Sequence, residues 1–484
     1  MALAVESAMK NRLTRRRFLT GTVVPALMAA APFAAAEDHA GYPLQTSPMS
    51  GGDGTVEQAD TNAFSLPQGN LSMTKRLDFS VGNSFFRNPW VEAPASTDAR
   101  DGLGPLFNTN SCQGCHIKDG RGHPPSVDSP SVSLFLRLAV PADPETDAEL
   151  LEQHGFRPAP VYGSQLQTAA ISGMKPEADL VLDWRTITET LPDGTAIELR
   201  EPVYRIENPQ YGPMPENLLV SPRVAPPMIG MGLLEAIPVA RLESLEDAQD
   251  RNDDGISGHL NRVWSLDQRA TVPGRFGWKA AEPDVHQQAM GAFAGDMGLT
   301  SSQRPQTDCT PEQGCEGFPD GGQPEVSDKV AGFVTFYSRT LAVPARRDMD
   351  NPAVRAGARL FNEAGCARCH TPRHTTGEVA DRPDLSNQTI WPYSDLLLHD
   401  MGERLADHRP VFEASGREWR TPPLWGIGLT QTVNPQAGFL HDGRARTLEE
   451  AILWHGGEAS AATEAYRSMD AADRASLIRF LESL

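Results

Sequence analysis

The chain of 484 residues repeats blocks of its own sequence in the same order, and this duplication restricts the fold more than any other feature. A Leu-Phe-Asn triplet precedes Cys112 and, at the same offset, precedes Cys366. Downstream, residues 226–233 (PPMIGMGL) are echoed by residues 422–429 (PPLWGIGL), and an arginine stands shortly before each block. Similar blocks in a fixed order indicate repeated structural units, so we predict two related modules.

Each predicted module contains one CxxCH motif, at residues 112–116 and at residues 366–370. Two thiols three positions apart on a helical turn can form thioethers to the vinyl groups of one haem, and the adjacent histidine then lies beneath the iron as its proximal ligand. A structural zinc site is disfavoured because no second CxxC or HxxxH pair follows at zinc-finger spacing. The sequence predicts two covalently bound haem c groups, held by Cys112, Cys115, His116, Cys366, Cys369 and His370.

The duplication predicts an N-terminal haem module at residues 76–340 and a C-terminal cytochrome-c-like haem module at residues 341–484. The first module is longer because it contains an insertion at about residues 126–222. Within the insertion, residues 186–190 and 196–199 flank a Pro-Asp-Gly turn, which predicts a β-hairpin. The 40 prolines and 42 glycines suit short helices joined by long loops. The predicted fold is mainly α, with a β-containing insertion in the first module.

The N-terminus is typical of a signal peptide over residues 1–36. Residues 12–17 are rich in arginine, residues 21–33 are apolar, and three alanines follow where a peptidase would cut. The run TRRRFL at residues 14–19 has twin-arginine character, and the apolar stretch is too short to span a bilayer. We expect export to the periplasm and no membrane anchor after cleavage. Residues 37–75 are rich in Gly, Pro and polar residues, which predicts a flexible tether.

The formal net charge of −20 restricts the partners of the protein. Nucleic acids are polyanions that are held by basic patches, so we expect no nucleic acid partner. An acidic surface serves solubility, and it also suits docking to a small basic redox protein. The partners that we expect are a small redox donor protein and a small-molecule substrate.

Two further cysteines, Cys309 and Cys315, lie in a short polar loop. In an oxidising compartment such a pair predicts a disulfide that closes the loop. The alternative is a reactive dithiol, but the acidic residues of this loop do not favour a thiolate.

A helix predicted after residue 447 bears on the second axial ligand of the second haem. Residues 447–450 (TLEE) form a capping box, and the helix is expected to end near residues 456–457 (GG). His455 shares one helix face with Leu448 and Ile452, so it is predicted to point inward. We therefore predict that His455 ligates the second haem. Met401 is the alternative ligand.

A weaker third echo of the duplication relates residues 274–292 to residues 438–455 and puts Ala292 where His455 stands. Alanine does not bind iron, so the first haem is predicted to have an open or labile face. An open face permits reaction with a small molecule, whereas a six-coordinate haem mainly transfers electrons. The residues that would otherwise cap the first haem are His123, His286 and Met297.

The chain resembles the bacterial di-haem cytochrome c peroxidase superfamily, in particular its di-haem oxidoreductase branch, often labelled thiol oxidoreductase. The motifs that carry this resemblance are the two LFNxxxCxxCH blocks, residues 420–424 (RTPPL), residues 439–444 (FLHDGR) and residues 447–451 (TLEEA). The resemblance covers most of residues 100–484. It implies an oxidoreductase in which electrons enter at the second haem and reduce a peroxide-like substrate at the first. The alternatives are a di-haem electron carrier and a thiol-linked redox partner.

The resemblance also implies catalytic residues. Family members line the peroxide pocket with a Gln and an acidic residue before a Met, and Gln288, Asp296 and Met297 are similar to that run. The spacing is two residues shorter and Asp replaces the usual Glu. Trp278 is matched to a tryptophan between the haems, and core packing is the alternative. The family has a methionine where this chain has His455, which implies a bis-histidine haem of lower potential.

Residues 250–256 resemble the start of an EF-hand loop, with side-chain oxygens at positions 1, 3 and 5 and glycine at position 6. Position 12 is Asn261 rather than the bidentate glutamate, so a full EF-hand is not expected. Relatives hold calcium between their haem domains, and the resemblance implies calcium here too. The alternative is an Asp/Asn-rich turn. The predicted ligands are Asp250, Asn252, Asp254 and Ile256.

Overall fold

The computed structural model describes residues 41–126 and 131–484, which belong to one compact unit. The predicted signal peptide, residues 1–36, lies outside the described residues. Within the two described ranges, no helix combines the length and the apolar character needed to cross a membrane. Both predicted haem modules fall within this unit, and the boundary between them at residue 340 stays a prediction.

The described part of the predicted tether is packed against the rest of the chain. Val56 forms a parallel β-bridge with Pro344, and Phe64 is 1% exposed within the hydrophobic core. The prediction of a flexible tether at residues 37–75 is therefore wrong for its described residues. Its Gly, Pro and polar content is that of a linker, but a few buried side chains and backbone bridges are enough to fix such a segment.

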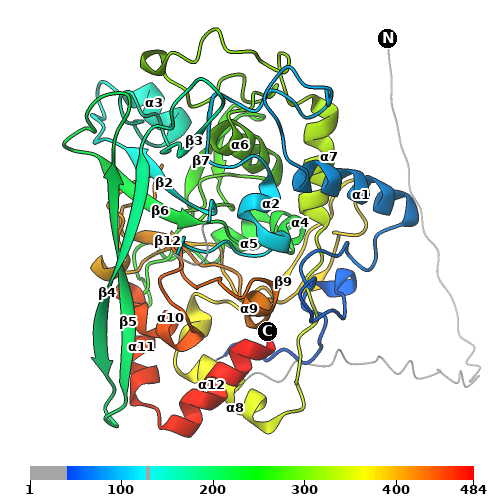
Figure 1. The fold of residues 1–484 in the computed structure, drawn as a ribbon. Helices are drawn as coiled ribbons and strands as arrows, with labels where there is room; N and C mark the ends of the chain where they lie inside the picture. Colours follow the sequence, from blue (N-terminus) through cyan, green and yellow to red (C-terminus); the bar gives the residue numbers. More distant parts are fainter. Residues whose placement is uncertain (1–40, 127–130) are drawn as a thin grey trace, which may run out of the picture. The chain divides into compact units, whose positions relative to one another are not determined.

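Three helices surround the first CxxCH motif (Figure 1): α1 (Met73–Arg87), α6 (Val285–Met297) and α7 (Asp328–Thr340). Gly82 allows α1 to approach α7 closely, because a Cβ at this position would lie 2.3 Å from the carbonyl oxygen of Phe333. The two helices therefore pack at backbone distance and fix one wall of the first site.

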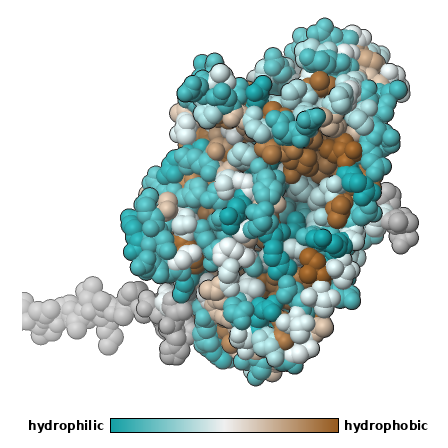
Figure 2. Space-filling model, turned by 90° about the vertical axis from the view of Figure 1, so that its left-hand side faces the viewer, coloured by the Kyte–Doolittle hydropathy of each residue, from teal (hydrophilic) through white to brown (hydrophobic). Residues whose placement is uncertain are grey.

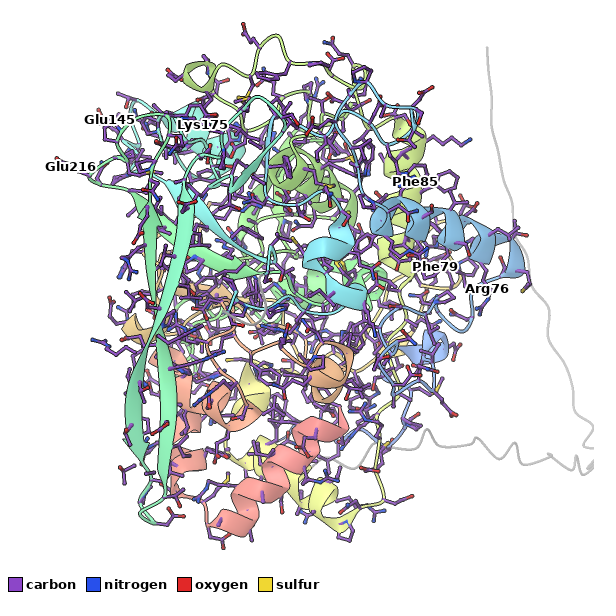
Figure 3. The ribbon with its side chains drawn as sticks, in the orientation of Figure 1. Arg76, Phe79, Phe85, Glu145, Lys175 and Glu216 are labelled. Carbon is purple, nitrogen blue, oxygen red and sulfur yellow. A yellow bond between two sulfur atoms is a disulfide. The ribbon has the colours of Figure 1, made fainter. Side chains whose placement is uncertain are left out.

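The side chains of α1 divide between core and solvent (Figure 3). Phe79 is 5% exposed, and its ring centroid lies 4.6 Å from that of Tyr337 on α7. Phe85 is partly buried against the same core, whereas Arg76 donates to backbone carbonyls of the segment just before the helix. The next aromatic, Phe86, lies with its ring centroid 6.1 Å from that of His116, so α1 supports the first motif.

The C-terminal part is helical around the second motif, with α8 (Pro352–Glu363), α10 (Leu448–Trp454), α11 (Ser460–Ser468) and α12 (Ala471–Ser483). Thr447 caps α10 by accepting a hydrogen bond from the Glu450 N–H at 3.1 Å, as its capping-box pattern predicts. The predicted helix and its end before residues 456–457 are confirmed. Gly357 lets α8 pack directly on α12, since a Cβ there would lie 2.0 Å from the carbonyl oxygen of Ser476.

The hairpin predicted in the insertion is confirmed. β4 (Asp179–Thr190) pairs with β5 (Ala196–Glu207), and both strands are longer than the sequence pattern indicated. β2 (Leu134–Ala139) pairs antiparallel with β6 (Leu219–Val224), so the two ends of the insertion are joined. The remaining pairs are β1 (Leu106–Phe107) with β3 (Ala169–Ala170), β7 (Arg262–Ser265) with β8 (Ala270–Pro273), β9 (His374–Thr375) with β10 (Thr389–Ile390), and β11 (Leu398–Asp400) with β12 (Glu418–Arg420).

The fold is mixed rather than mainly α, which corrects the predicted fold class. Helices account for 29% of the described residues, and every sheet in these ranges has two antiparallel strands. Several pairs, such as β2 with β6, join segments far apart in the sequence, and local patterns do not reveal such pairing. The duplication itself stays a prediction. The remaining helices are α2 (Cys112–Cys115), α3 (Ala148–His154), α4 (Met231–Glu235), α5 (Val239–Glu243) and α9 (Thr430–Val433).

Two large hydrophobic clusters form the core. The first includes residues of α1, α6 and α7, and the second includes residues of α8, α10 and α12. Trp278 precedes α6 in the sequence but packs in the second cluster. The face shown in Figure 2 is largely hydrophilic, with one concentration of apolar residues in its upper half.

Candidate functional site

A cavity of about 570 Å³ lies beside the first CxxCH motif, a volume within the range of cofactor pockets. Cys112, Cys115 and His116 line it, together with much of α6. Residues of the segment 420–430, which belongs to the predicted C-terminal module, complete the lining. The cavity is therefore built from both predicted modules.

The ring of His116 is held in the orientation that an iron ligand requires. Its Nδ1 lies 2.7 Å from the carbonyl oxygen of Pro226. Because a carbonyl only accepts, Nδ1 carries the proton, and Nε2 is left for a metal. Burial lowers the pKa of His116 to about 4, so the imidazole is neutral at physiological pH, as ligation requires.

Buried cations in the same cavity fit the remaining part of a haem. Arg121 and Arg223 both line the cavity, and the Nε of Arg121 and one terminal nitrogen of Arg223 are buried without a partner. Burial lowers the pKa of each guanidinium to about 10, so both remain charged at neutral pH. Unpaired buried donors are costly, and a haem propionate would satisfy them. The thiols, the imidazole and these cations together fit a covalently bound haem.

The second CxxCH motif repeats the arrangement of the first. It follows α8, and the Nδ1 of His370 lies 3.0 Å from the carbonyl oxygen of Tyr393, which again leaves Nε2 for iron. Burial lowers the pKa of His370 to about 4. Burial also raises the pKa of the Cys366 thiol, to about 12. The donor set at Cys366, Cys369 and His370 thus matches that of the first site.

His455 directly follows α10, and its Nδ1 lies 2.7 Å from the carbonyl oxygen of Ala451. The same reasoning leaves its Nε2 available, and burial lowers its pKa. The charge of His455 lowers the pKa of His370, so the two rings lie within electrostatic range of each other. Met401 is half-buried in the hydrophobic cluster that includes Cys366. Both candidate ligands thus lie near the second motif, and the choice of His455 stays a prediction.

The residues predicted to act at the first haem lie together. Gln288, Asp296 and Trp278 all line the first cavity, as does Ala292. Of the three residues named as alternative caps, Met297 is also among the lining residues, whereas His123 and His286 are not. The Nδ1 of His286 lies instead 3.0 Å from the hydroxyl oxygen of Thr335 on α7.

The carboxylate of Asp296 is engaged through one of its oxygens. The amide Nε2 of Gln165 donates to Oδ1 at 2.9 Å. Burial raises the pKa of Asp296, while Arg137 and the bond from Gln165 oppose this rise. The thiol of Cys112 has a pKa raised by burial and, to a lesser degree, by the charge of Asp296, so the carboxylate lies near the haem attachment residues. A half-buried acid that lines a cavity is suited to general acid–base chemistry.

Trp278 contacts both predicted modules. Its indole N–H donates to the carbonyl oxygen of Val224 at 2.8 Å, and its own carbonyl accepts from the Arg420 N–H at 2.9 Å. Its side chain lines the first cavity, lies under the guanidinium of Arg121 at 5.1 Å, and packs in the second hydrophobic cluster. Core packing and a place between the two sites are therefore both compatible with its position.

Sequence reasoning missed several residues in or next to the first cavity. Arg137 from the insertion lines it, Gln165 from the insertion donates a hydrogen bond to the lining residue Asp296, and Glu282 precedes α6. Glu282 lines the cavity and accepts a hydrogen bond from Gln287 at 2.9 Å. None of the three lies in a motif, so only the tertiary structure identifies them. Arg223 could have been found from the sequence, because it stands shortly before residues 226–233, the first of the two repeated PP blocks.

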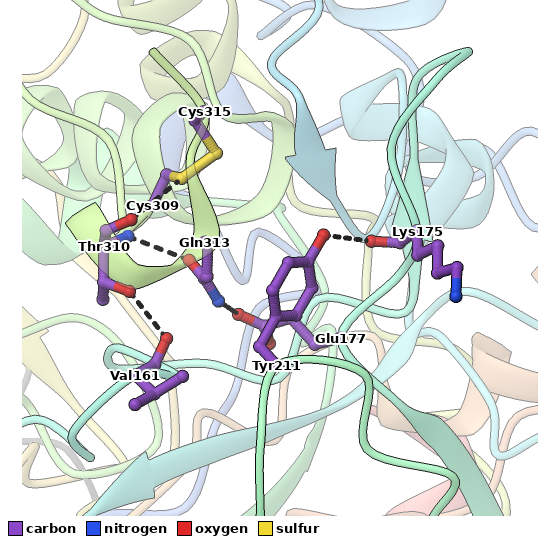
Figure 4. The surroundings of a disulfide bond; sticks show 8 residues. All are labelled: Val161, Lys175, Glu177, Tyr211, Cys309, Thr310, Gln313 and Cys315. Carbon is purple, nitrogen blue, oxygen red and sulfur yellow. Dashed lines mark hydrogen bonds between the residues drawn. A yellow bond between two sulfur atoms is a disulfide. The ribbon is translucent and has the colours of Figure 1, made fainter.

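The disulfide predicted between Cys309 and Cys315 is confirmed, with a Cα–Cα distance of 6.4 Å. Figure 4 shows how the loop that it closes is attached to the insertion. The hydroxyl of Thr310 donates to the carbonyl oxygen of Val161 at 2.8 Å, and the amide of Gln313 donates to the carboxylate of Glu177. The disulfide is thus part of a structural anchor, which favours it over a reactive dithiol.

The loop predicted to bind calcium forms a tight turn. The carboxylate of Asp250 accepts hydrogen bonds from the N–H groups of Asp254 and Gly255, and Asp254 accepts one from the N–H of Ile256. Over the part of the chain that the structure describes, no group of three or more His, Cys, Asp or Glu side chains is arranged to hold a metal ion. The bonds are those of the Asp/Asn-rich turn, and calcium at this loop stays a prediction.

Comparison with known proteins connects these features to a family. A family model described as "Di-haem oxidoreductase, putative peroxidase" matches residues 45–484. No curated protein matches the sequence. Among solved structures, the chain is similar to a chain of the xenon-pressurised hydrazine synthase of Kuenenia stuttgartiensis, with 19% identity and a TM-score of 0.23. That similarity covers 38% of this chain and 65% of the other, and a TM-score this low supports no conclusion about fold or function.

Proposed function

Because the chain belongs to the di-haem oxidoreductase family, we propose that it is an exported enzyme with two covalently bound haem c groups that reduces a small, peroxide-like substrate at the first haem. One observation carries this proposal. Gln288, Asp296 and Trp278 line the same cavity as the first CxxCH motif, and no histidine of the described ranges other than His116 and His154 does. The first haem would have a reactive face with polar groups around it, provided that neither His154 nor Met297 ligates the iron.

The first haem, when bound, supplies electrons to the substrate at its iron. Reduction of hydrogen peroxide to two molecules of water consumes two electrons and two protons. The amide of Gln288 would hydrogen-bond and orient the peroxide, and the carboxyl group of Asp296 would carry a proton to the departing oxygen. Burial raises the pKa of Asp296, which favours its protonated, donating form.

Electrons would enter from a small redox donor protein at the second haem, which His370 and His455 would ligate. A bis-histidine haem mainly transfers electrons, because both axial positions are filled. Trp278 supports a route from the second haem to the first, since its ring packs in the second cluster and lines the first cavity. Calcium at the turn of residues 250–256 is a further part of the proposal.

Replacement of the Asp296 carboxylate tests the proposal. Asp296→Ala should lower peroxide turnover by about 10²–10⁴-fold, the usual contribution of general acid–base catalysis, while both haems stay attached. His286→Ala is a matched control, because His286 is a titratable residue on the same helix that bonds to α7 rather than lining the cavity. Its turnover should stay within about twofold of that of the native protein. Full activity of Asp296→Ala would remove the residue from the mechanism.

The competing function is that of a di-haem electron carrier without catalysis of its own. Met297 favours it, because this buried thioether lines the first cavity and would fill the axial position of the first haem. Peroxide, cyanide and carbon monoxide should each perturb the spectrum of the first haem of an enzyme. If none of them does so in oxidised or half-reduced protein, the carrier is the correct function.

A further inference from the structure

Two buried glutamines of the insertion reach the C-terminal end of α6 from behind the first cavity. Gln165 is fully buried, and its Nε2 donates to Oδ1 of Asp296 at 2.9 Å. Gln167 is 3% exposed, and its Nε2 donates to the carbonyl oxygen of Gly295 at 2.8 Å. The two side chains thus support the same turn of α6, but only Gln165 touches the side chain that lines the cavity.

The bond from Gln165 fixes the direction of the carboxylate. It engages Oδ1, so Oδ2 is the oxygen that remains to face a substrate. The amide of Gln165 is itself held, because its Nε2 also donates to the side-chain oxygen of Asn108. An amide donor orients a carboxylate without adding a positive charge, and therefore disturbs the proton affinity of the carboxylate less than an arginine at the same distance would.

The backbone around Gln165 is fixed by Asp308. The carboxylate of Asp308 accepts hydrogen bonds from the N–H of Ser164 at 2.9 Å and from the N–H of Gln165 at 3.0 Å. Gly163 has a φ of +63°, and a Cβ there would lie 2.8 Å from the carboxylate of Asp308. The position therefore needs glycine, both for its backbone conformation and for the space that Asp308 occupies.

Asp308 is fixed in turn by the disulfide loop. It directly precedes Cys309, whose bond to Cys315 closes the loop, and Thr310 anchors that loop to the insertion (Figure 4). A continuous chain of contacts therefore runs from the disulfide through Asp308 and Gln165 to Asp296.

We propose that Gln165 is a positioning residue that aims the carboxylate of Asp296 into the first haem cavity, with Asp308 and the disulfide loop fixing Gln165. The inference rests on the proposed function of Asp296 as a proton donor. Displacement of a catalytic group lowers the rate of the reaction rather than the affinity for substrate. A displacement of about 1 Å can lower the rate by about 10²-fold.

Gln165→Met tests this role, because methionine has a similar length and no N–H donor. In the haem-loaded protein, kcat for hydrogen peroxide should fall by about 10–100-fold, while KM changes by less than about twofold. Haem content and absorption spectrum should be those of the native protein. Gln167→Met is the matched control, since it removes a comparable buried bond to α6 and should change kcat by less than about twofold.

A double-mutant cycle separates positioning from a general effect on structure. In the Asp296→Ala background, Gln165→Met should have no further effect on kcat. An equal loss in both backgrounds, or an unchanged kcat when Asp296 is present, would overturn the role of Gln165 alone. If Asp296→Ala itself leaves kcat unchanged, the proposed function fails and this inference fails with it. Should Gln165→Met not fold, Gln165→Asn makes the same test, because its amide is one methylene too short to reach Asp296.

Discussion

At the scale of single residues, hydrogen bonds to the imidazole rings separate candidate iron ligands from other histidines. His116, His370 and His455 each engage a carbonyl oxygen through Nδ1, which leaves Nε2 for a metal. His399 also lies near the second motif, but buried carboxylates hold both of its ring nitrogens, at 2.7 and 2.9 Å. Cys369 and then Asp395 raise the pKa of His399 despite its burial. With both ring nitrogens bonded to carboxylates, His399 has no nitrogen left for iron.

The ligand of the second haem is tested by His455→Met. A thioether favours ferrous iron more than an imidazole does, so this substitution should raise the reduction potential of the second haem. A spectroscopic redox titration measures it, and the potential of the first haem should not change. Met401→Leu is the matched control and should leave both potentials unchanged. A shift caused by Met401→Leu but not by His455→Met would identify Met401 as the ligand.

At the scale of elements, the insertion and the disulfide loop complete the first cavity. β2 supplies Arg137 to the lining, and the segment between α3 and β3 supplies Ser164 to the lining and Gln165 to Asp296. The hairpin β4–β5 reaches the C-terminal part of the chain, where Arg200 donates to the carbonyl oxygen of Arg444 at 2.9 Å. The insertion therefore connects the two parts of the molecule that contain the CxxCH motifs.

The disulfide should stabilise the protein modestly. Cys309→Ser opens a loop with a sequence separation of 6, and the loss of chain restriction should lower the free energy of unfolding by about 2–3 kcal/mol. Denaturant unfolding of the native and variant proteins, both fully loaded with haem, measures the difference. Gly314→Asn is a control in the same loop, because it leaves the disulfide intact and asparagine tolerates the left-handed backbone of this exposed residue, whose φ is +69°. A stability equal to that of the native protein would show that the disulfide does not restrain the loop.

A carboxyl group that is hydrogen-bonded to the same loop should make stability depend on pH. Burial raises the pKa of Glu177, which accepts the hydrogen bond from Gln313, to about 8, whereas a glutamate in the unfolded chain titrates near 4.5. The folded state therefore binds the proton more tightly, and its contribution to stability is complete below pH 4.5 and is lost as the pH rises to about 8.

Glu177→Gln keeps the shape of the side chain and removes the titration. The free energy of unfolding of the native protein should fall relative to that of the variant between pH 4.5 and 8, by an amount on the order of 1–3 kcal/mol. Parallel slopes for the two proteins over this range would contradict a buried, protonated Glu177.

Features that depend on local sequence were predicted, and features that depend on contacts distant in sequence were not. The hairpin β4–β5 and the cap of α10 were predicted correctly because each depends on a local pattern, the Pro-Asp-Gly turn and the pair Thr447 with Glu450. The packing of residues 41–72 and the pairing of β2 with β6 were not, because they depend on contacts distant in sequence. For the same reason Gln288 and Asp296 could be proposed from a motif, whereas Gln165 could not.

At the scale of the whole molecule, the two predicted haem sites differ in what surrounds them. The first has a cavity lined by an amide, a carboxyl group, Ala292 and two guanidinium groups, each of which has one unpaired nitrogen. The second has His455 within electrostatic range of His370. Trp278 touches both surroundings. This asymmetry is the basis for assigning chemistry to the first site and electron entry to the second.

We propose that the first haem has an open or labile face and that the second haem does not. Electron paramagnetic resonance measures this directly, because an open ferric haem is high-spin and a bis-histidine ferric haem is low-spin. We expect one low-spin haem per chain that cyanide leaves unchanged. The other haem should be high-spin in the oxidised or the half-reduced protein and become low-spin with cyanide. Two low-spin haems in both states, neither of them altered by cyanide, would contradict the proposal.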